Sequence, residues 1–235
     1  MLKKSLMVAT LLTGLVVGPA QAADLFIPEV IVDPVALTWS GCYIGADIRA
    51  NTGRTSETFP YSDYATNITG PGIAPQIGCD YQLEDSPFLV GIVADVAALN
   101  DRGDNIVVPG AFPQRLTSSL DWLASVRARA GYVADKTLFY ATAGIAFGNV
   151  TTRLEVVGGA LDATSNVTQV GYTVGGGIET LVTDNISVFA EYNYTDLGRS
   201  THTFAGAAGL RGPAGNELDL LTVNHTVKVG VNYRF

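Results

Sequence analysis

Two histidines, His202 and His225, are the side chains of this sequence best suited to acid–base or metal chemistry. A hydrolytic site pairs a histidine with a serine or with a carboxylate. Groups of this kind lie near the histidines along the chain, at Asp196, Ser200, Glu217 and Asp219. Short polar residues are also the ordinary content of loops, and two histidines without a ligand spacing are a weak metal signal. We therefore predict that the protein is not an enzyme and holds no metal or cofactor, and we keep a surface receptor for heme or another small ligand as an alternative.

Charged residues also stand out, because they occur inside segments that alternate apolar and polar side chains. Successive residues of a strand face opposite sides, so each charge can be assigned to one face. The charges on the polar face are Asp47, Arg49, Asp80, Asp95, Arg127, Arg129, Glu179, Glu191 and Lys228. Asp121 is assigned to the same face. Because an unpaired buried charge is strongly destabilising, we expect a structural network of ion pairs. The alternative is that these residues line a narrow ion path.

The elements that must position these charges are eight alternating segments. They cover residues 42–50, 73–82, 88–99, 120–132, 137–149, 170–182, 185–196 and 222–235. The apolar face of 137–149 has Phe139 and Phe147 near its ends and small or aliphatic residues between them. Aromatic residues at both ends of a strand are typical of a wall that crosses two membrane interfaces.

The connections between these segments are long and short in strict turn. The short ones are 83–87, 133–136 and 183–184, and the long ones are 51–72, 100–119, 150–169 and 197–221. Barrels of bacterial outer membranes have short periplasmic turns and long outer loops. A soluble barrel or sandwich would also give alternating strands, but it does not predict apolar faces free of charge. The pattern predicts an all-β fold, an eight-stranded antiparallel transmembrane up-and-down β-barrel.

Both ends of the chain agree with export to the outer membrane. Residues 1–22 have a basic head, a short apolar run and a small-residue cleavage site, which predicts a signal peptide. Residues 23–40 contain two prolines and are expected to form an extended periplasmic leader before a barrel domain at 41–235. The last segment ends on Tyr233 and Phe235, which we interpret as the signal read by the barrel-assembly machinery.

Composition limits the classes of partner. Only 15% of residues are charged and 47% are hydrophobic. A secreted soluble protein with so apolar a surface would aggregate. The difficulty disappears if the apolar faces contact outer-membrane lipid. The formal net charge of −8 argues against nucleic-acid binding, which needs a basic surface.

Six strings in this order carry a family resemblance. They are WSGCYIG (39–45), LDWLASVRARAGY (120–132), LFYATAGIAFG (138–148), GYTVGGGIE (171–179), EYNYTDLG (191–198) and VGVNYRF (229–235). The chain resembles the small porin-like outer-membrane proteins of alphaproteobacteria, a family of surface antigens. The resemblance implies an eight-stranded barrel at the cell surface that is tied to envelope integrity and host contact.

The sequence departs from that family at its two cysteines. Cys42 and Cys79 stand where the family usually carries aromatic residues, and by alternation both point outward near the periplasmic ends of neighbouring strands. Two cysteines of an exported protein are more often bridged than free. A disulfide between them is our hypothesis, and two lipid-facing thiols out of register are the alternative.

These observations lead to one expected function and two alternatives. We expect an integral protein of the outer membrane of a Gram-negative bacterium, with a structural and surface-interaction role in envelope integrity. The alternatives are a narrow porin-like channel for ions or small solutes and the heme or small-ligand receptor. Host surface molecules are candidate partners of the exposed loops.

Overall fold

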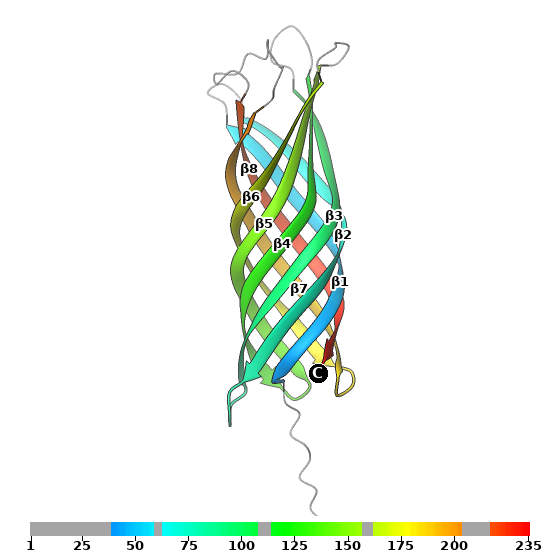
Figure 1. Ribbon diagram of the computed structural model, residues 1–235, viewed down its shortest axis with the longest axis vertical. Helices are drawn as coiled ribbons and strands as arrows, with labels where there is room; N and C mark the ends of the chain where they lie inside the picture. Colours follow the sequence, from blue (N-terminus) through cyan, green and yellow to red (C-terminus); the bar gives the residue numbers. More distant parts are fainter. Residues whose placement is uncertain (1–38, 59–62, 108–113, 157–161, 204–216) are drawn as a thin grey trace, which may run out of the picture. The chain divides into compact units, whose positions relative to one another are not determined.

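The computed structural model describes residues 39–58, 63–107, 114–156, 162–203 and 217–235. The predicted signal peptide, and the leader as far as residue 38, lie outside these ranges. The described residues form β1 (Gly41–Thr58), β2 (Asp63–Gln82), β3 (Phe88–Val107), β4 (Gln114–Ala134), β5 (Thr137–Val156), β6 (Asp162–Leu181), β7 (Ile186–Thr203) and β8 (Glu217–Arg234). Each strand pairs antiparallel with the next, and β8 pairs with β1 to close the barrel (Figure 1). The predicted eight-stranded antiparallel barrel is confirmed. Among the same residues, no helix is long and apolar enough to cross a membrane.

Three short turns lie at one end of the barrel, together with the C-terminus (Figure 1). We call this the turn end, and the other the far end. Asp85 and Asp135 in two of these turns have positive φ angles of 51° and 52°. Aspartate tolerates this left-handed conformation better than most residues. The aspartate in each of these two turns therefore favours the backbone conformation that the turn requires.

Strands extend further toward the far end than the alternation predicts. β1 and β2 stay paired from Gly41↔Asp80 to Thr58↔Asp63, so much of the predicted loop 51–72 is strand. The outward residues of this extension include Thr52 and Arg54, which are exposed and polar. Both faces are polar there, so hydropathy no longer alternates although backbone pairing continues. The four predicted long loops were therefore too long.

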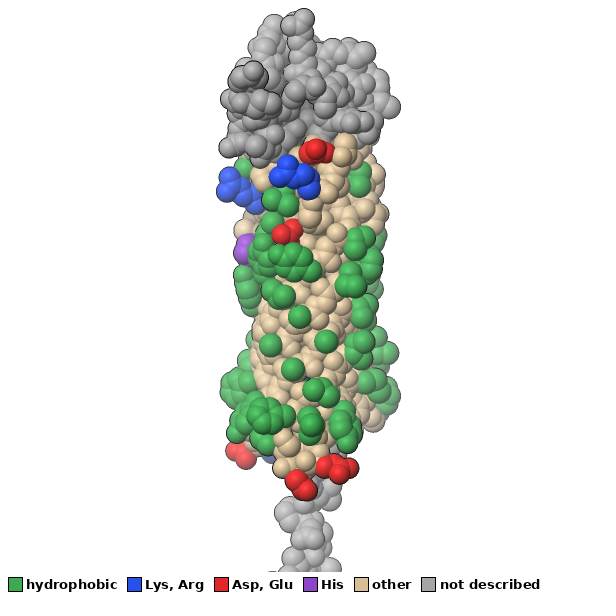
Figure 2. Space-filling view, turned by 90° about the vertical axis from the view of Figure 1, so that its left-hand side faces the viewer, with side chains coloured by type: hydrophobic (Ala, Val, Ile, Leu, Met, Phe, Trp, Pro, Cys, Tyr) green, Lys and Arg blue, Asp and Glu red, His purple; other side chains and the backbone are tan. Residues whose placement is uncertain are grey.

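The outer wall carries the apolar side chains of the alternating segments. Ile48, Ile73, Ile145 and Val170 are all more than half exposed, and Phe139 and Phe147 point outward as predicted. Figure 2 shows hydrophobic side chains spread over the wall, with acidic side chains at the turn end. Such a wall is a liability in water but suits lipid.

A β-bulge in β4 places one charged residue, Asp121, on the opposite face from the one predicted. The register of β4 shifts between Leu120 and Trp122 against β5. An extra residue in one strand reverses the alternation beyond it. Leu120 is therefore buried in the lumen, and Asp121, which was predicted inward, is exposed and accepts hydrogen bonds from Ser119 and Thr151.

The lumen is filled in layers rather than open. An apolar cluster at the turn end contains Trp39, Leu89, Leu138, Tyr140 and Leu181. A second apolar cluster lies further along the strands and contains Ile68, Ala74, Ala97, Leu120, Leu123, Ala146, Val150 and Leu197. The predicted inward charges lie between the two clusters along the strands. The interior of an eight-stranded barrel is just wide enough for side chains to fill it.

Candidate functional site

The candidate site is the charged layer of the lumen. It comprises five acids and five bases, all buried: Asp47, Asp80, Asp95, Glu179, Glu191, Arg49, Arg127, Arg129, Lys228 and Arg234. Nine of these ten side chains are the inward charges predicted from alternation. They come from seven of the eight strands, so the layer exists only in the closed barrel.

Arg127 of β4 is the centre of one half of this layer. Its Nη2 lies 2.8 Å from Asp95 Oδ1, and its Nη1 bonds Glu191. Lys228 Nζ lies 3.0 Å from the same carboxylate of Glu191. On the other side, Arg49 Nη2 lies 3.0 Å from Asp95. Asp47 ends the chain of pairs, 2.7 Å from Arg49.

Arg129 is the centre of the other half. Its Nη1 lies 3.0 Å from Asp80, and its Nη2 bonds Glu179. Arg234 Nη2 contacts the same two carboxylates, at 2.8 Å and 3.1 Å. Two arginines and two carboxylates thus neutralise each other in a closed group. Tyr43 adds its hydroxyl, 3.2 Å from Arg129.

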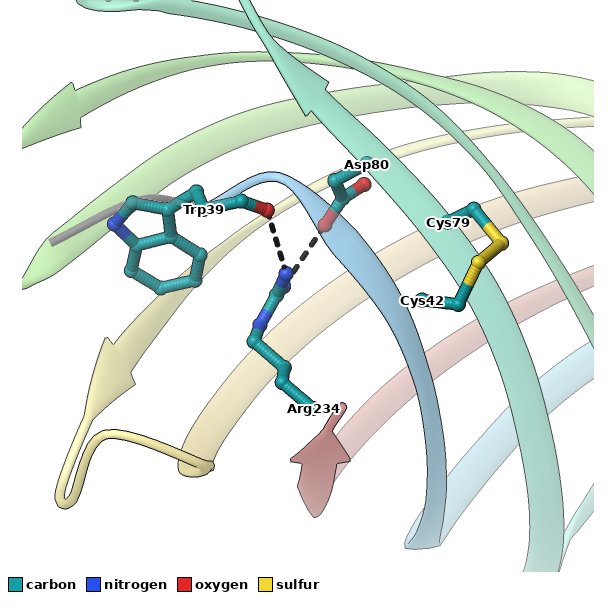
Figure 3. The surroundings of a disulfide bond; sticks show 5 residues. All are labelled: Trp39, Cys42, Cys79, Asp80 and Arg234. Carbon is teal, nitrogen blue, oxygen red and sulfur yellow. Dashed lines mark hydrogen bonds and ion pairs between the residues drawn. A yellow bond between two sulfur atoms is a disulfide. The ribbon is translucent and has the colours of Figure 1, made fainter.

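The turn end of the lumen is closed by Trp39 and Arg234 (Figure 3). Arg234 Nη1 donates a 2.9 Å hydrogen bond to the backbone oxygen of Trp39. Its guanidinium lies 4.6 Å from the Trp39 ring and 4.8 Å from the Tyr43 ring. Such cation–π contacts are attractive, and more so when desolvated. Arg234 is on β8 and Trp39 precedes β1. This contact therefore also joins the first and the last strand of the barrel.

A disulfide lies beside this closure. Cys42 of β1 and Cys79 of β2 are register partners and are bonded to each other. Their side chains lie on the lipid side of the wall, while the neighbouring Asp80 points inward to Arg234 (Figure 3). The described residues contain no free cysteine.

Almost no space is left among the charges. The cavity lined by Arg49, Asp95, Arg127 and Lys228 has a volume of about 10 Å³. Such a volume holds at most about one water molecule. This cavity is therefore too small to hold a hydrated ion.

Comparison with known proteins places this arrangement in a family. The model of the outer membrane protein beta-barrel domain matches residues 8–235. The chain belongs to this family. Its localisation is accordingly the outer membrane of Gram-negative bacteria. The turn end is the periplasmic end, because outer-membrane barrels have their short turns there. The far end is therefore the outer end.

Curated relatives match most of the chain. The 31 kDa outer-membrane immunogenic protein of Brucella melitensis is 29% identical over 234 residues, which are 92% of this chain and 93% of the relative. The 22 kDa outer membrane protein of Rhizobium leguminosarum bv. viciae is 29% identical over 200 residues, which are 84% and 79% of the two chains. The predicted resemblance to outer-membrane proteins of alphaproteobacteria is confirmed.

Solved structures that resemble the chain have low sequence identity to it. The outer membrane protease OmpT of Escherichia coli is 12% identical, has a TM-score of 0.50, and covers 82% of this chain and 97% of its own. Neisserial surface protein A is 19% identical with a TM-score of 0.41, covering 83% and 98%. Neither likeness bears on activity.

The outer-membrane barrel keeps its two histidines apart. His202, predicted to lie in a loop, is on β7, is fully buried and faces the lumen. His225 faces outward, with Nδ1 2.7 Å from the hydroxyl of Tyr192. The two rings lie on opposite faces of the wall and so form no common heme or metal site. The residues with described positions contain no group of three His, Cys, Asp or Glu side chains that could hold a metal.

The serine and carboxylates noted near the histidines in the sequence do not assemble around a histidine among the described residues either. Gln169 donates to Ser200 Oγ at 2.5 Å, and Asp219 accepts from Thr201 at 2.6 Å. Asp196 accepts from the backbone of Gly198. No described Ser–His–carboxylate chain results.

Sequence reasoning missed two residues of the site. Arg234 is the next charged residue after Lys228 on the polar face of the last alternating segment, so the same argument could have included it. Trp39 precedes β1 and was assigned to the leader. No periodic signal precedes β1, so its place in the lumen depends on tertiary contacts alone.

Proposed function

We propose that the protein is a structural outer-membrane barrel with a non-conducting lumen, which supports envelope integrity and presents its outer end to host molecules or ligands. The observation that carries the proposal is the charged layer with its cavity of about 10 Å³. A barrel that conducts needs a continuous water path, and this cavity has room for about one water.

The ion pairs also resist opening. Each carboxylate of the layer contacts at least one cationic side chain, and Asp80, Asp95, Glu179 and Glu191 each contact two. Removing one partner of such a buried pair costs about 3–5 kcal/mol, because the other charge is then left buried and unpaired. Thermal opening of the layer is therefore rare, and this favours a structural role over a gated pore.

The names of the relatives support the surface-interaction part of the proposal. The Brucella relative is called an immunogenic outer-membrane protein. An immunogenic protein is one that the host meets. By analogy, we propose that the outer end of this barrel contacts host molecules.

Single-channel recording tests the closed lumen. The full-length mature protein, purified from outer membranes, is placed in a planar lipid bilayer at high salt. We expect no discrete current steps. The positive control is an Arg127→Ala, Glu191→Ala double variant, which removes two large side chains of the layer and should give measurable steps if it retains heat-modifiable gel mobility.

Discrete, reproducible steps from the unaltered barrel would contradict the proposal. If neutral substitutions at Arg127 and Glu191 changed the ion selectivity of these current steps, the channel interpretation would replace the structural one. The envelope role is tested separately, in a deletion strain that should become sensitive to detergent and recover when the unaltered gene is restored. Unchanged detergent resistance would contradict that part.

A further inference from the structure

The outer part of the lumen contains a buried carboxylate that no basic side chain neutralises. Asp101 of β3 is 1% exposed, and no salt bridge reaches it among the residues whose positions are described. Its Oδ1 accepts a 3.2 Å hydrogen bond from Asn51 Nδ2. Its Oδ2 is buried and has no hydrogen-bond partner among those residues. Each of the five acids in the charged layer, by contrast, contacts an arginine or lysine.

The imbalance also appears in the charge of the whole described lumen. The charged layer contains five acids and five bases, so its formal charge is zero. Asp101 is a sixth buried acid, so with His202 counted as neutral one negative charge is left uncompensated. Arg49, one inward position below Asn51 on β1, already binds Asp47 and Asp95. A lone buried charge is costly and demands a counter-charge or a proton.

Asn51 connects this carboxylate to two polar side chains of β8 through a chain of hydrogen bonds. Asn51 Oδ1 accepts from Thr226 Oγ1 at 2.8 Å, and Thr226 Oγ1 accepts from Asn224 Nδ2 at 3.3 Å. Asn224 is fully buried, and its Oδ1 has no hydrogen-bond partner. We call Asn51, Asp101, Asn224 and Thr226 the outer polar layer. Two of its buried oxygens, one of them anionic, thus lack a donor.

We infer that the outer polar layer binds one alkali-metal cation, Na⁺ or K⁺, with Asp101 Oδ2 and Asn224 Oδ1 as ligands. Carboxylate and amide oxygens are the ligands that hard cations prefer. One carboxylate among neutral oxygens matches a single positive charge, because a divalent ion would leave an excess charge in the lumen. The ion replaces the basic side chain that each carboxylate of the charged layer has.

Thermal unfolding in different salts tests the inference. The mature protein, purified from outer membranes in detergent, is held at constant ionic strength in NaCl, KCl or N-methyl-D-glucamine chloride. The midpoint is the temperature at which the heat-modifiable band converts to the unfolded one. We expect an alkali cation to raise this midpoint by at least about 2 °C over the bulky organic cation, because ligands that bind only the folded state stabilise it.

Two variants on the same strand separate this site from general salt effects. Asp101→Asn should abolish the alkali-dependent shift and should unfold at a higher temperature than the unaltered protein in the organic salt. Asp104→Asn removes an exposed carboxylate of β3 and should keep the full shift. If Asp101→Asn does not fold, Asn224→Ala takes its place, and its shift should fall below half.

Equal midpoints in all three salts would overturn the inference, since the carboxyl would then be neutralised by its own proton. An alkali shift that survives in Asp101→Asn would also overturn it. Crystals grown in RbCl give an independent test, in which an anomalous peak within bonding distance of Asp101 supports the site and its absence refutes it. None of these outcomes depends on whether the barrel conducts.

Discussion

The charged layer and the outer polar layer occupy the same lumen, but their buried polar atoms find their bonding partners in different ways. The charged layer pairs each carboxylate with an arginine or lysine, in four of five cases from another strand, as in the group of Arg129, Arg234, Asp80 and Glu179. The outer polar layer relies on hydroxyl and amide groups and leaves Asp101 Oδ2 and Asn224 Oδ1 without partners.

The difference follows the surroundings of the wall. The charged layer lies inside that part of the barrel whose outward residues are apolar, such as Ile48 and Ile73. The outer polar layer begins where the outward residues become polar, at Thr52 and Arg54. Ion pairs therefore hold the lumen where the wall is apolar, and hydrogen bonds of amide and hydroxyl groups hold it where the wall of β1 becomes polar.

The largest effect is expected from breaking the charged layer at Arg129. Arg129→Leu keeps most of the volume but leaves Asp80 and Glu179 with Arg234 as their only cation. We expect a loss of about 3–5 kcal/mol in the free energy of unfolding, because one partner of a buried network is removed. Urea titration of the protein in lipid vesicles, followed by tryptophan fluorescence, measures it.

The matched control for Arg129 is the exposed ion pair at the outer end. Arg153 lies 2.5 Å from Asp162, and both side chains are about half exposed. Arg153→Leu should leave the urea midpoint unchanged, since exposed pairs contribute little. Equal losses in the two variants would mean that burial does not distinguish the charged layer.

A smaller effect is expected from crowding the same layer. A Cβ atom at Gly144 would lie 2.0 Å from the backbone oxygen of Val126 and 2.6 Å from Cα of Arg127. Gly144→Ala must therefore push β4 and β5 apart beneath Arg127. We expect about 1–3 kcal/mol of destabilisation, the usual result of overpacking, in the same urea titration.

Gly176 on the adjacent strand β6 gives the control for this substitution. Its Cβ would meet only the backbone oxygen of Tyr140, at 3.3 Å. Gly176→Ala should therefore be tolerated. A larger loss at Gly176 than at Gly144 would show that the propensity of the strand, rather than the packing of the lumen, sets the result.

The sequence predicted one of these two layers and not the other. Alternation placed Asp47 and Arg127 correctly because their outward neighbours are apolar, so the two faces differ. It failed beyond residue 50, where Thr52 and Arg54 make both faces polar. Asp101 was accordingly assigned to a loop.

A bulge explains the error at Asp121. The register shift at Leu120 turned Asp121 outward, and a second shift, between Asp196 and Arg199 in β7, lies before the inward-facing His202. A bulge reverses the period-two pattern without a fixed sequence signal. Residues beyond one can therefore be placed only once the pairing partners are known.

The smallest effect is expected in the outer polar layer, at Thr226. Thr226→Val keeps the shape but removes the hydroxyl that donates to Asn51 and accepts from Asn224. We expect a loss of about 1–2 kcal/mol in urea, because neutral hydrogen bonds contribute less than buried ion pairs. Thr52→Val, on the exposed face of β1, should change nothing. A loss at Thr226 as large as that at Arg129 would contradict the comparison, since the outer polar layer would then contribute as much to the free energy of unfolding as the charged layer does.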